Sequence, residues 1–255
     1  MKRVGVLVLY SVQETLRDRL LLGLLAAGAI LLLLVGLLAP MTLGAREKTF
    51  HDLGLAWIHL SGILILLVLG VWTLHRERER GIWLTILTRP VTRVEYVFGR
   101  LLGLLCTLAL ALLGSALVYS IVAWITGLGP VSGLGISLAY GFLEMSILAG
   151  LIFLFSTFSG FALTVFLAMA VFFAGHLSAD LLRLAALTEN PLAGGLATVF
   201  HWLLPHLEIF RVRDAIVGGA APAPMEVLRS TGYALAYLGA LAAVATAIFL
   251  RRDIR

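Results

Sequence analysis

Charged residues are scarce in this sequence. Asp, Glu, Lys and Arg make up 13% of its 255 residues and hydrophobic residues 61%, whereas soluble domains have roughly a quarter charged residues and about half apolar ones. This composition excludes an ordinary soluble domain, because the excess apolar surface would face water. A helix that crosses a membrane needs about 20 mostly apolar residues, since hydrocarbon offers the backbone no hydrogen-bonding partner.

Cysteine, lysine and the common nucleotide-binding and hydrolytic motifs are also rare or missing. A single cysteine, Cys106, allows no intramolecular disulfide and no thiolate metal cluster. The phosphate-binding loop G-x-x-x-x-G-K-[ST] is missing, since neither Lys2 nor Lys48 follows a glycine. We therefore predict that this chain does not hydrolyse ATP by itself. The H-E-x-x-H and G-x-S-x-G motifs are missing too, so an enzyme would have to rely on Glu144, His176 and Asp180.

Long uncharged runs are what the sequence does have. The run from Leu20 to Ala45 provides one span, and the 43 uncharged residues between Arg100 and Glu144 provide two. Glycines and a proline in residues 127–135 predict a tight turn between those two. We predict an all-α polytopic membrane protein, a single transmembrane domain over residues 1–255. Its six spans are expected near residues 20–40, 54–74, 101–125, 135–156, 161–180 and 231–250.

The basic residues predict the orientation. Six spans place both termini on one side of the membrane, and 13 of the 19 Lys and Arg residues fall on that side. Short cytoplasmic loops carry an excess of Lys and Arg, so we expect both termini in the cytoplasm. The net charge of +5 then reflects topology and lipid contact rather than nucleic-acid binding.

Two segments on the cytoplasmic side have sequence patterns that predict helices rather than simple connecting loops. Residues 1–19 have apolar positions at three- and four-residue spacing, which predicts an amphipathic helix in the membrane interface; the alternative is a plain extension of the first span. In residues 75–100, Pro90 ends one helix, and Thr92 with Glu95 has the spacing of a capping box. We expect a short rigid helix there, parallel to the membrane and suited to docking a partner. A solvated charged loop is the alternative.

The outer half contains the remaining polar features. We expect residues 181–229 to form a long external loop whose apolar parts, 197–204 and 207–217, rest on the membrane or the spans. His176 and Asp180 are four residues apart, which favours a hydrogen-bonded pair at a helix end. Five of the six histidines map to this half, but their spacing demands no metal site.

Glu144 lies about ten residues into the fourth expected span, where a carboxylate is costly and normally faces a protein interior or a wet cavity. It could be protonated there, since desolvation disfavours the charged form. A place in a conduction path or a dimer seam and a structural hydrogen bond between helices are both open.

Three runs resemble ABC type-2 permeases, the membrane subunits of ATP-binding cassette transporters. They are Arg78–Arg93 followed by Phe98–Arg100, then Leu203–Asp214, and finally Phe249–Ile254. The likeness touches the beginning, middle and end of the chain. The subgroup it resembles includes permeases linked to the maturation of multi-copper enzymes such as nitrous oxide reductase.

The resemblance implies a division of labour. A separate cytoplasmic ATPase would bind ATP and Mg, this chain holding no cofactor, and would drive export or mechanical transmission through the permease. The residues that would contact the ATPase, as a coupling helix, are Arg89, Pro90, Val91, Thr92, Arg93 and Glu95. Residues 1–19 would be an elbow helix, and the external loop would contain short re-entrant helices.

Further partners and the location follow from the same resemblance. A second permease copy, identical or not, would complete the membrane part, among lipids of a prokaryotic inner membrane, and an external accessory protein is a further candidate. The sequence names neither the substrate nor the direction of movement. The alternative function is a membrane-embedded enzyme or an ion-coupled carrier that uses Glu144.

Overall fold

The computed structural model describes residues 5, 8–9, 11–14, 19–38, 46–79, 93–187, 195, 198–200, 202–220 and 222–251. Within these ranges every regular element is helical. Six of the helical segments are long and apolar enough to cross a membrane. The predicted all-α class with six spans is therefore confirmed.

The six spans follow one another along the chain. The first is α2 (Arg19–Leu38). The second comprises α3 (Arg46–Ile65), the π-helical turn η2 (Leu66–Gly70) and α4 (Val71–Glu79). The remaining spans are α6 (Arg93–Ile125), α7 (Leu134–Ser156), α8 (Phe161–Leu187) and α11 (Pro224–Arg251). Between α8 and α11 lie the 3-10 turn η3 (Leu207–Phe210) and the short helix α10 (Arg213–Val217).

Several helices are longer than the uncharged runs that predicted them. Helix α3 begins at Arg46, α8 continues to Leu187 and α11 begins at Pro224. Charge limits how far a segment can lie in hydrocarbon but does not end a helix, since charged residues are good helix formers in water. Pro224 suits a first helical position because the missing N–H would have no intrahelical partner there. Uncharged runs thus locate the spans without giving the helix ends.

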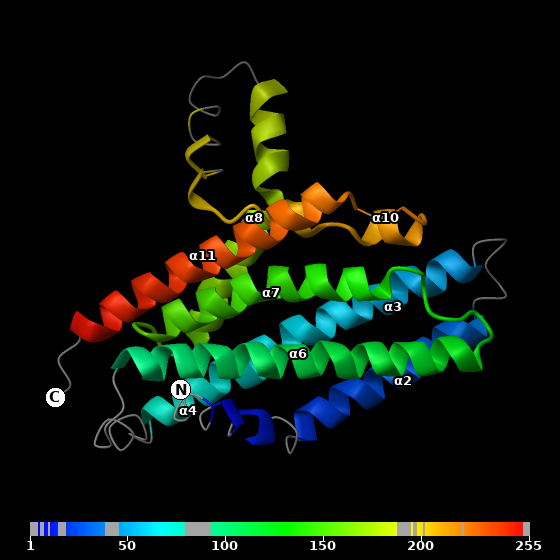
Figure 1. Ribbon diagram of the computed structural model, residues 1–255, viewed down its shortest axis with the longest axis horizontal. Helices are drawn as coiled ribbons and strands as arrows, with labels where there is room; N and C mark the ends of the chain where they lie inside the picture. Colours follow the sequence, from blue (N-terminus) through cyan, green and yellow to red (C-terminus); the bar gives the residue numbers. More distant parts are fainter. Residues whose placement is uncertain are drawn as a thin grey trace.

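Helix α7 is the centre of the bundle. It packs against α11, α6 and α8, and every residue from Glu144 to Phe153 is buried. Figure 1 shows α2, α3, α6 and α7 running side by side, with α11 lying obliquely along α7 and α8 rising away from the bundle. Helices α2, α8 and α11 keep large apolar side chains exposed. A helix buried on all sides is typical of a bundle centre, whereas one-sided burial is typical of the lipid-facing rim.

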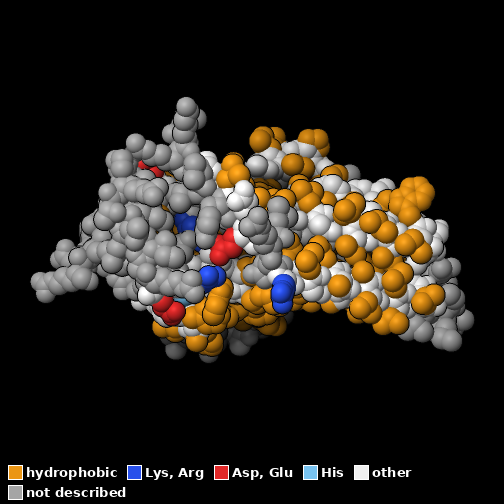
Figure 2. All heavy atoms as spheres, turned by 90° about the horizontal axis from the view of Figure 1, so that it is seen from below, with side chains coloured by type: hydrophobic (Ala, Val, Ile, Leu, Met, Phe, Trp, Pro, Cys, Tyr) orange, Lys and Arg blue, Asp and Glu red, His pale blue; other side chains and the backbone are white. Residues whose placement is uncertain are grey.

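The exposed surface separates apolar from charged regions. On the face shown in Figure 2, apolar side chains cover most of the bundle, and the Lys, Arg, Asp and Glu side chains gather toward one end. That end, called the basic end below, is where α4 ends and α6 begins. A broad apolar band bounded by charge matches a hydrocarbon layer bounded by headgroups.

The opposite, outer end contains the turn between α6 and α7. Gly127, Gly129 and Gly133 have positive φ angles there, of 74°, 68° and 96°, which is a left-handed conformation that glycine adopts without strain. This confirms the tight turn that residues 127–135 predicted. Gly133 also packs closely on α10, since a Cβ at this position would lie 3.1 Å from Ile216.

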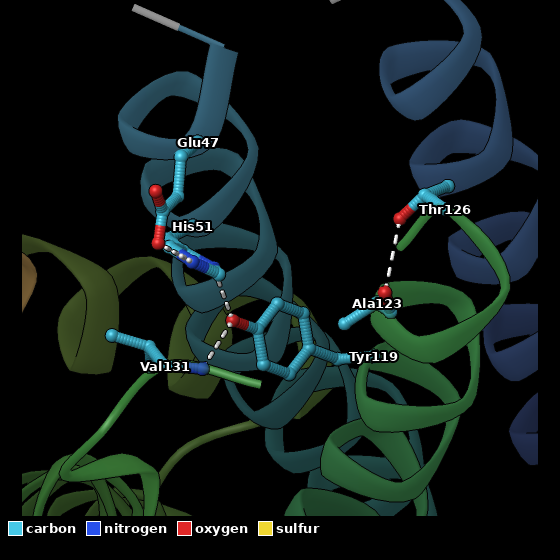
Figure 3. A network of polar contacts seen from close by, with 6 residues as sticks. All are labelled: Glu47, His51, Tyr119, Ala123, Thr126 and Val131. Atoms are coloured by element: carbon cyan, nitrogen blue, oxygen red, sulfur yellow. Dashed lines mark hydrogen bonds and ion pairs between the residues drawn. The ribbon is translucent and has the colours of Figure 1, made fainter. Parts of the chain in front are cut away.

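Tyr119 of α6 fastens this turn to α3 (Figure 3). Its hydroxyl accepts a hydrogen bond from the Val131 N–H at 3.2 Å and lies 2.7 Å from Nδ1 of His51. Nε2 of His51 is 3.7 Å from Glu47. The Tyr119 ring fits against Gly54, where a Cβ would approach it to 2.4 Å. A small residue on α3 thus allows the close helix contact that this polar connection needs.

The basic end differs from the sequence expectation. Helix α6 begins at Arg93, directly after Thr92, but it continues without interruption to Ile125. The prediction of a short helix that begins at Thr92 and is separate from the third span is therefore wrong. Residues from Arg93 onward are the first turns of the third span itself. No proline interrupts residues 93–125, so nothing forces a second break there. Arg89, Pro90, Val91 and Thr92 lie outside the described residues.

The Tyr119 connection can be tested with two matched tyrosines. Tyr119→Phe removes a hydroxyl that serves Val131 and the buried His51, so we expect the free energy of unfolding to fall by about 1–3 kcal/mol. Tyr140 is also buried, but within the described residues its hydroxyl has no hydrogen-bond partner. Tyr140→Phe should therefore be neutral or slightly stabilising. Unfolding in mixed detergent micelles measures both, and equal losses would contradict this role of Tyr119.

Candidate functional site: an outer cavity around Glu144

Three helices bring ionisable side chains together in the outer half of the bundle. They are His59 of α3, Glu144 of α7 and His176 of α8. Glu144 Oε1 lies 2.9 Å from Nε2 of His176 and 3.5 Å from Nε2 of His59. The Glu144 side chain is 4% exposed, against 24% for His176 and 33% for His59. The carboxylate is thus the buried member, with the two imidazoles between it and the open side.

The hydrogen bonding of His176 fixes where protons must lie. Its Nδ1 is 3.0 Å from the carbonyl oxygen of Phe172. A carbonyl only accepts, so Nδ1 must carry a hydrogen. In the neutral imidazole Nε2 then carries no hydrogen, and its lone pair would lie 2.9 Å from the carboxylate oxygen of Glu144 and repel it. A further proton on the Glu144–His176 contact relieves this repulsion, as a carboxylic acid with neutral imidazole or as a carboxylate with imidazolium. Either way this pair has no net charge.

A cavity of about 390 Å³ opens beside this cluster. Drug-sized ligand sites have volumes of about 300–1,000 Å³ and a few converging polar groups. The wall is formed by side chains of α3, α7 and α8 and by the segment before and within α10. The lining residues are Leu55, His59, Ser137, Gly141, Glu144, His176, Phe210, Arg211, Val212, Arg213 and Asp214.

The return of the chain after α8 builds the mouth of this cavity. Leu207 and Phe210 are buried, and Leu207 packs on α8 at Gly175, where a Cβ would lie 2.7 Å from the Pro205 carbonyl oxygen. The Phe210 ring contacts the rings of Tyr140 and Tyr233. These contacts confirm that residues 207–217 rest on the spans. They also hold Arg211, Arg213 and Asp214 at the mouth, with exposed side chains.

Some expectations about these residues were right and others wrong. Glu144 contacts another helix and lines a cavity, and its place in a conduction path or a dimer seam stays a prediction. The expected pair of His176 with Asp180 is wrong, since Asp180 lies 3.7 Å from Arg183 and His176 contacts Phe172 and Glu144. Sequence reasoning assigned no role to His59, whose partner Glu144 is distant along the chain, or to Arg211. Among the described residues no group of three His, Cys, Asp or Glu side chains could hold a metal ion.

At the basic end, part of the N-terminal segment contacts the second and third spans. Residues 11–14 are helical. Ser11 is buried and accepts a hydrogen bond of 2.7 Å from Nη1 of the buried Arg100 in α6. Glu14 lies 3.9 Å from Nη1 of Arg76 in α4. Most of the amphipathic helix expected over residues 1–19 lies outside the described residues.

Six apolar helices with a polar cavity between them define a multi-pass membrane protein. The profile of the ABC-2 family transporter proteins matches residues 17–175, which is more than half of the chain. The chain belongs to this family. The match includes His59 and Glu144 and ends one residue before His176. A search of curated proteins finds no match to this chain.

The proton argument can be tested at Glu144. In Glu144→Gln the amide can donate to Nε2 of His176, so we expect the free energy of unfolding to change by less than about 1 kcal/mol. Glu144→Ala leaves both imidazoles without this partner and should cost about 1–3 kcal/mol. Unfolding in mixed micelles measures both variants. A Gln variant as unstable as the Ala variant would contradict the shared proton, and full transport activity of both would remove Glu144 from the mechanism.

Proposed function

We propose that this chain is the permease subunit of an ABC transporter and couples ATP hydrolysis by a separate cytoplasmic ATPase to export or mechanical transmission. The observation that carries the proposal is the family match over residues 17–175. Two permease chains, identical or not, would form the membrane part with two ATPase subunits. ATP and Mg would bind the ATPase, so this chain needs no cofactor of its own.

The contact with the ATPase is proposed for the segment that joins α4 to α6. Residues 80–92 follow α4, which ends at Glu79, and precede α6, which begins at Arg93. A displacement of this segment would act directly on both spans, because no further loop separates it from either. Arg93 and Glu95 belong to the first turn of α6, so with Arg89, Pro90, Val91 and Thr92 they form the proposed docking region. Ser11 and Glu14 would move with α6 and α4 through Arg100 and Arg76.

We place the basic end in the cytoplasm of a prokaryotic cell and the outer cavity on the opposite side. The excess of basic residues on the side of the termini supports this orientation. Membership of the subgroup linked to multi-copper enzyme maturation is a finer proposal that rests on the resemblance of the three runs described above. An external accessory protein would meet the chain on this outer side.

An ion-coupled carrier is the second candidate, and one observation favours it. The Glu144–His176 contact holds a proton inside the membrane, as proton relays in carriers do. Such a carrier would work in liposomes without an ATPase. Transport by the purified chain alone, driven by a pH gradient, would favour this candidate over the permease.

The docking region is tested by charge reversal and cross-linking. Arg89→Glu with Arg93→Glu places like charges against any acidic partner surface, and like charges across an interface repel. We expect at least a tenfold loss of substrate-stimulated ATP hydrolysis by the co-expressed ATPase. A photo-cross-linker at Val91 should capture that ATPase.

The controls separate docking from folding. Arg229→Glu reverses an exposed charge on α11 toward the outer end and should leave ATP hydrolysis unchanged. Thr92→Ala with Glu95→Ala should lower coupling without preventing membrane insertion, because losing a helix cap costs only about 1 kcal/mol. If Val91 captures no ATPase and the reversed arginines leave hydrolysis intact, the permease proposal loses this contact.

The orientation is tested by thiol labelling of intact cells. Cysteines introduced at the exposed Lys48 and Ala220 should react with a membrane-impermeant maleimide, and one introduced at Arg80 should react only after lysis. Cys106→Ala removes the native thiol from the background. The reverse pattern would invert the proposed orientation.

A further inference from the structure

The charges around the outer cavity do not cancel. Because one proton lies on the Glu144–His176 contact, that pair contributes no net charge. The remaining permanently charged groups of the lining are Arg211, Arg213 and Asp214, two positive and one negative. His59 adds positive charge whenever it is protonated. The cavity is therefore net positive although a carboxylate lies at its floor.

The side chains of Arg211 and Arg213 also lack an ion-pair or hydrogen-bond partner among the described residues. In the part of the chain that the structure describes, no ion pair or hydrogen bond involves the guanidinium of Arg211 or Arg213. This contrasts with Arg183, which pairs with Asp180, and with Arg76 and Arg100, which contact the N-terminal segment. Guanidinium groups bind carboxylate and phosphate oxygens through two parallel hydrogen bonds. Two of them at the mouth of a cavity present a suitable pair of donors.

We propose that the outer cavity binds an anionic group, a phosphate or carboxylate, through Arg211 and Arg213, with His59 and the neutral Glu144–His176 pair at its floor. The ligand is either a free solute or the headgroup of an anionic phospholipid, since both carry the same oxygens. This goes beyond the proposed function, because binding in the cavity needs no ATPase.

The floor suits such a ligand better than a bare carboxylate would. An unprotonated Glu144 beside neutral histidines would repel an anion from the floor. The proton demanded by the Phe172–His176 hydrogen bond removes this repulsion. Gly141 leaves the space open, because only Nδ1 of His59, at 3.9 Å, lies within 4 Å of where its Cβ would be. The polar lining thus combines donors at the mouth with an uncharged floor.

Protection of a thiol inside the cavity tests the proposal. Ser137→Cys is made in a Cys106→Ala background, and the protein is placed in phosphatidylcholine nanodiscs and labelled with uncharged N-ethylmaleimide. Inorganic phosphate is added in one arm, and phosphatidylglycerol replaces part of the lipid in the other. We expect at least a threefold slower labelling of the thiol at position 137 in one or both arms. Protection by phosphate assigns a free solute, and protection by phosphatidylglycerol alone assigns a headgroup.

Matched variants decide whether the protection comes from the cavity. Gly135→Cys places the thiol on the same helix but outside the lining, at an exposed position, and should show no protection. Arg211→Gln with Arg213→Gln should abolish the protection at position 137, whereas Arg229→Gln should keep it. Unchanged labelling of the thiol at position 135 in each variant shows that the fold is retained. No protection in either arm, equal protection at both positions, or protection that survives loss of both arginines would overturn the proposal.

Discussion

Hydrocarbon offers no hydrogen-bonding partner, and the rest of this structure depends on that constraint. Backbone groups are satisfied within helices, and several polar side chains inside the spans find partners on neighbouring elements. Ser61 and Ser115 lie 2.7 Å apart between α3 and α6. The two ring nitrogens of the buried His75 lie 3.0 Å from the carbonyl oxygen of Val71 and 3.1 Å from that of Ser159. The Ser61–Ser115 contact thus joins α3 to α6, and the His75–Ser159 contact joins α4 to the turn between α7 and α8.

At Glu144 this constraint meets the outer cavity. A carboxylate that only stabilised the bundle could be surrounded completely, but Glu144 lies beside a cavity, with two histidines between it and the open side. One proton on the Glu144–His176 contact leaves that pair without net charge. The same arrangement leaves the arginines at the mouth as the dominant charges. One buried contact between α7 and α8 thus determines the electrostatic character of the outer half.

The sequence predicted what depends on local composition. Uncharged runs located six spans, and the glycines of residues 127–135 located a turn. Only part of the Glu144 cluster could be predicted. The sequence shows a carboxylate inside a span, which is costly, but its partners His59 and His176 are determined by how the helices pack. The helix at Arg93 shows the opposite failure: Thr92 indicated its start, but nothing local indicated whether it would stop before the third span.

The most direct measurement is a double-mutant cycle between Glu144 and His176. Glu144→Ala, His176→Ala and the double variant are compared with the parent chain by unfolding in mixed micelles. Residues that share a contact show interaction energies of about 0.5–3 kcal/mol, whereas independent residues add within about 0.5 kcal/mol. A shared proton requires an interaction energy above about 1 kcal/mol, since each single change disturbs the same bond. Strict additivity of the two changes would contradict it and would leave the buried carboxylate without its partner.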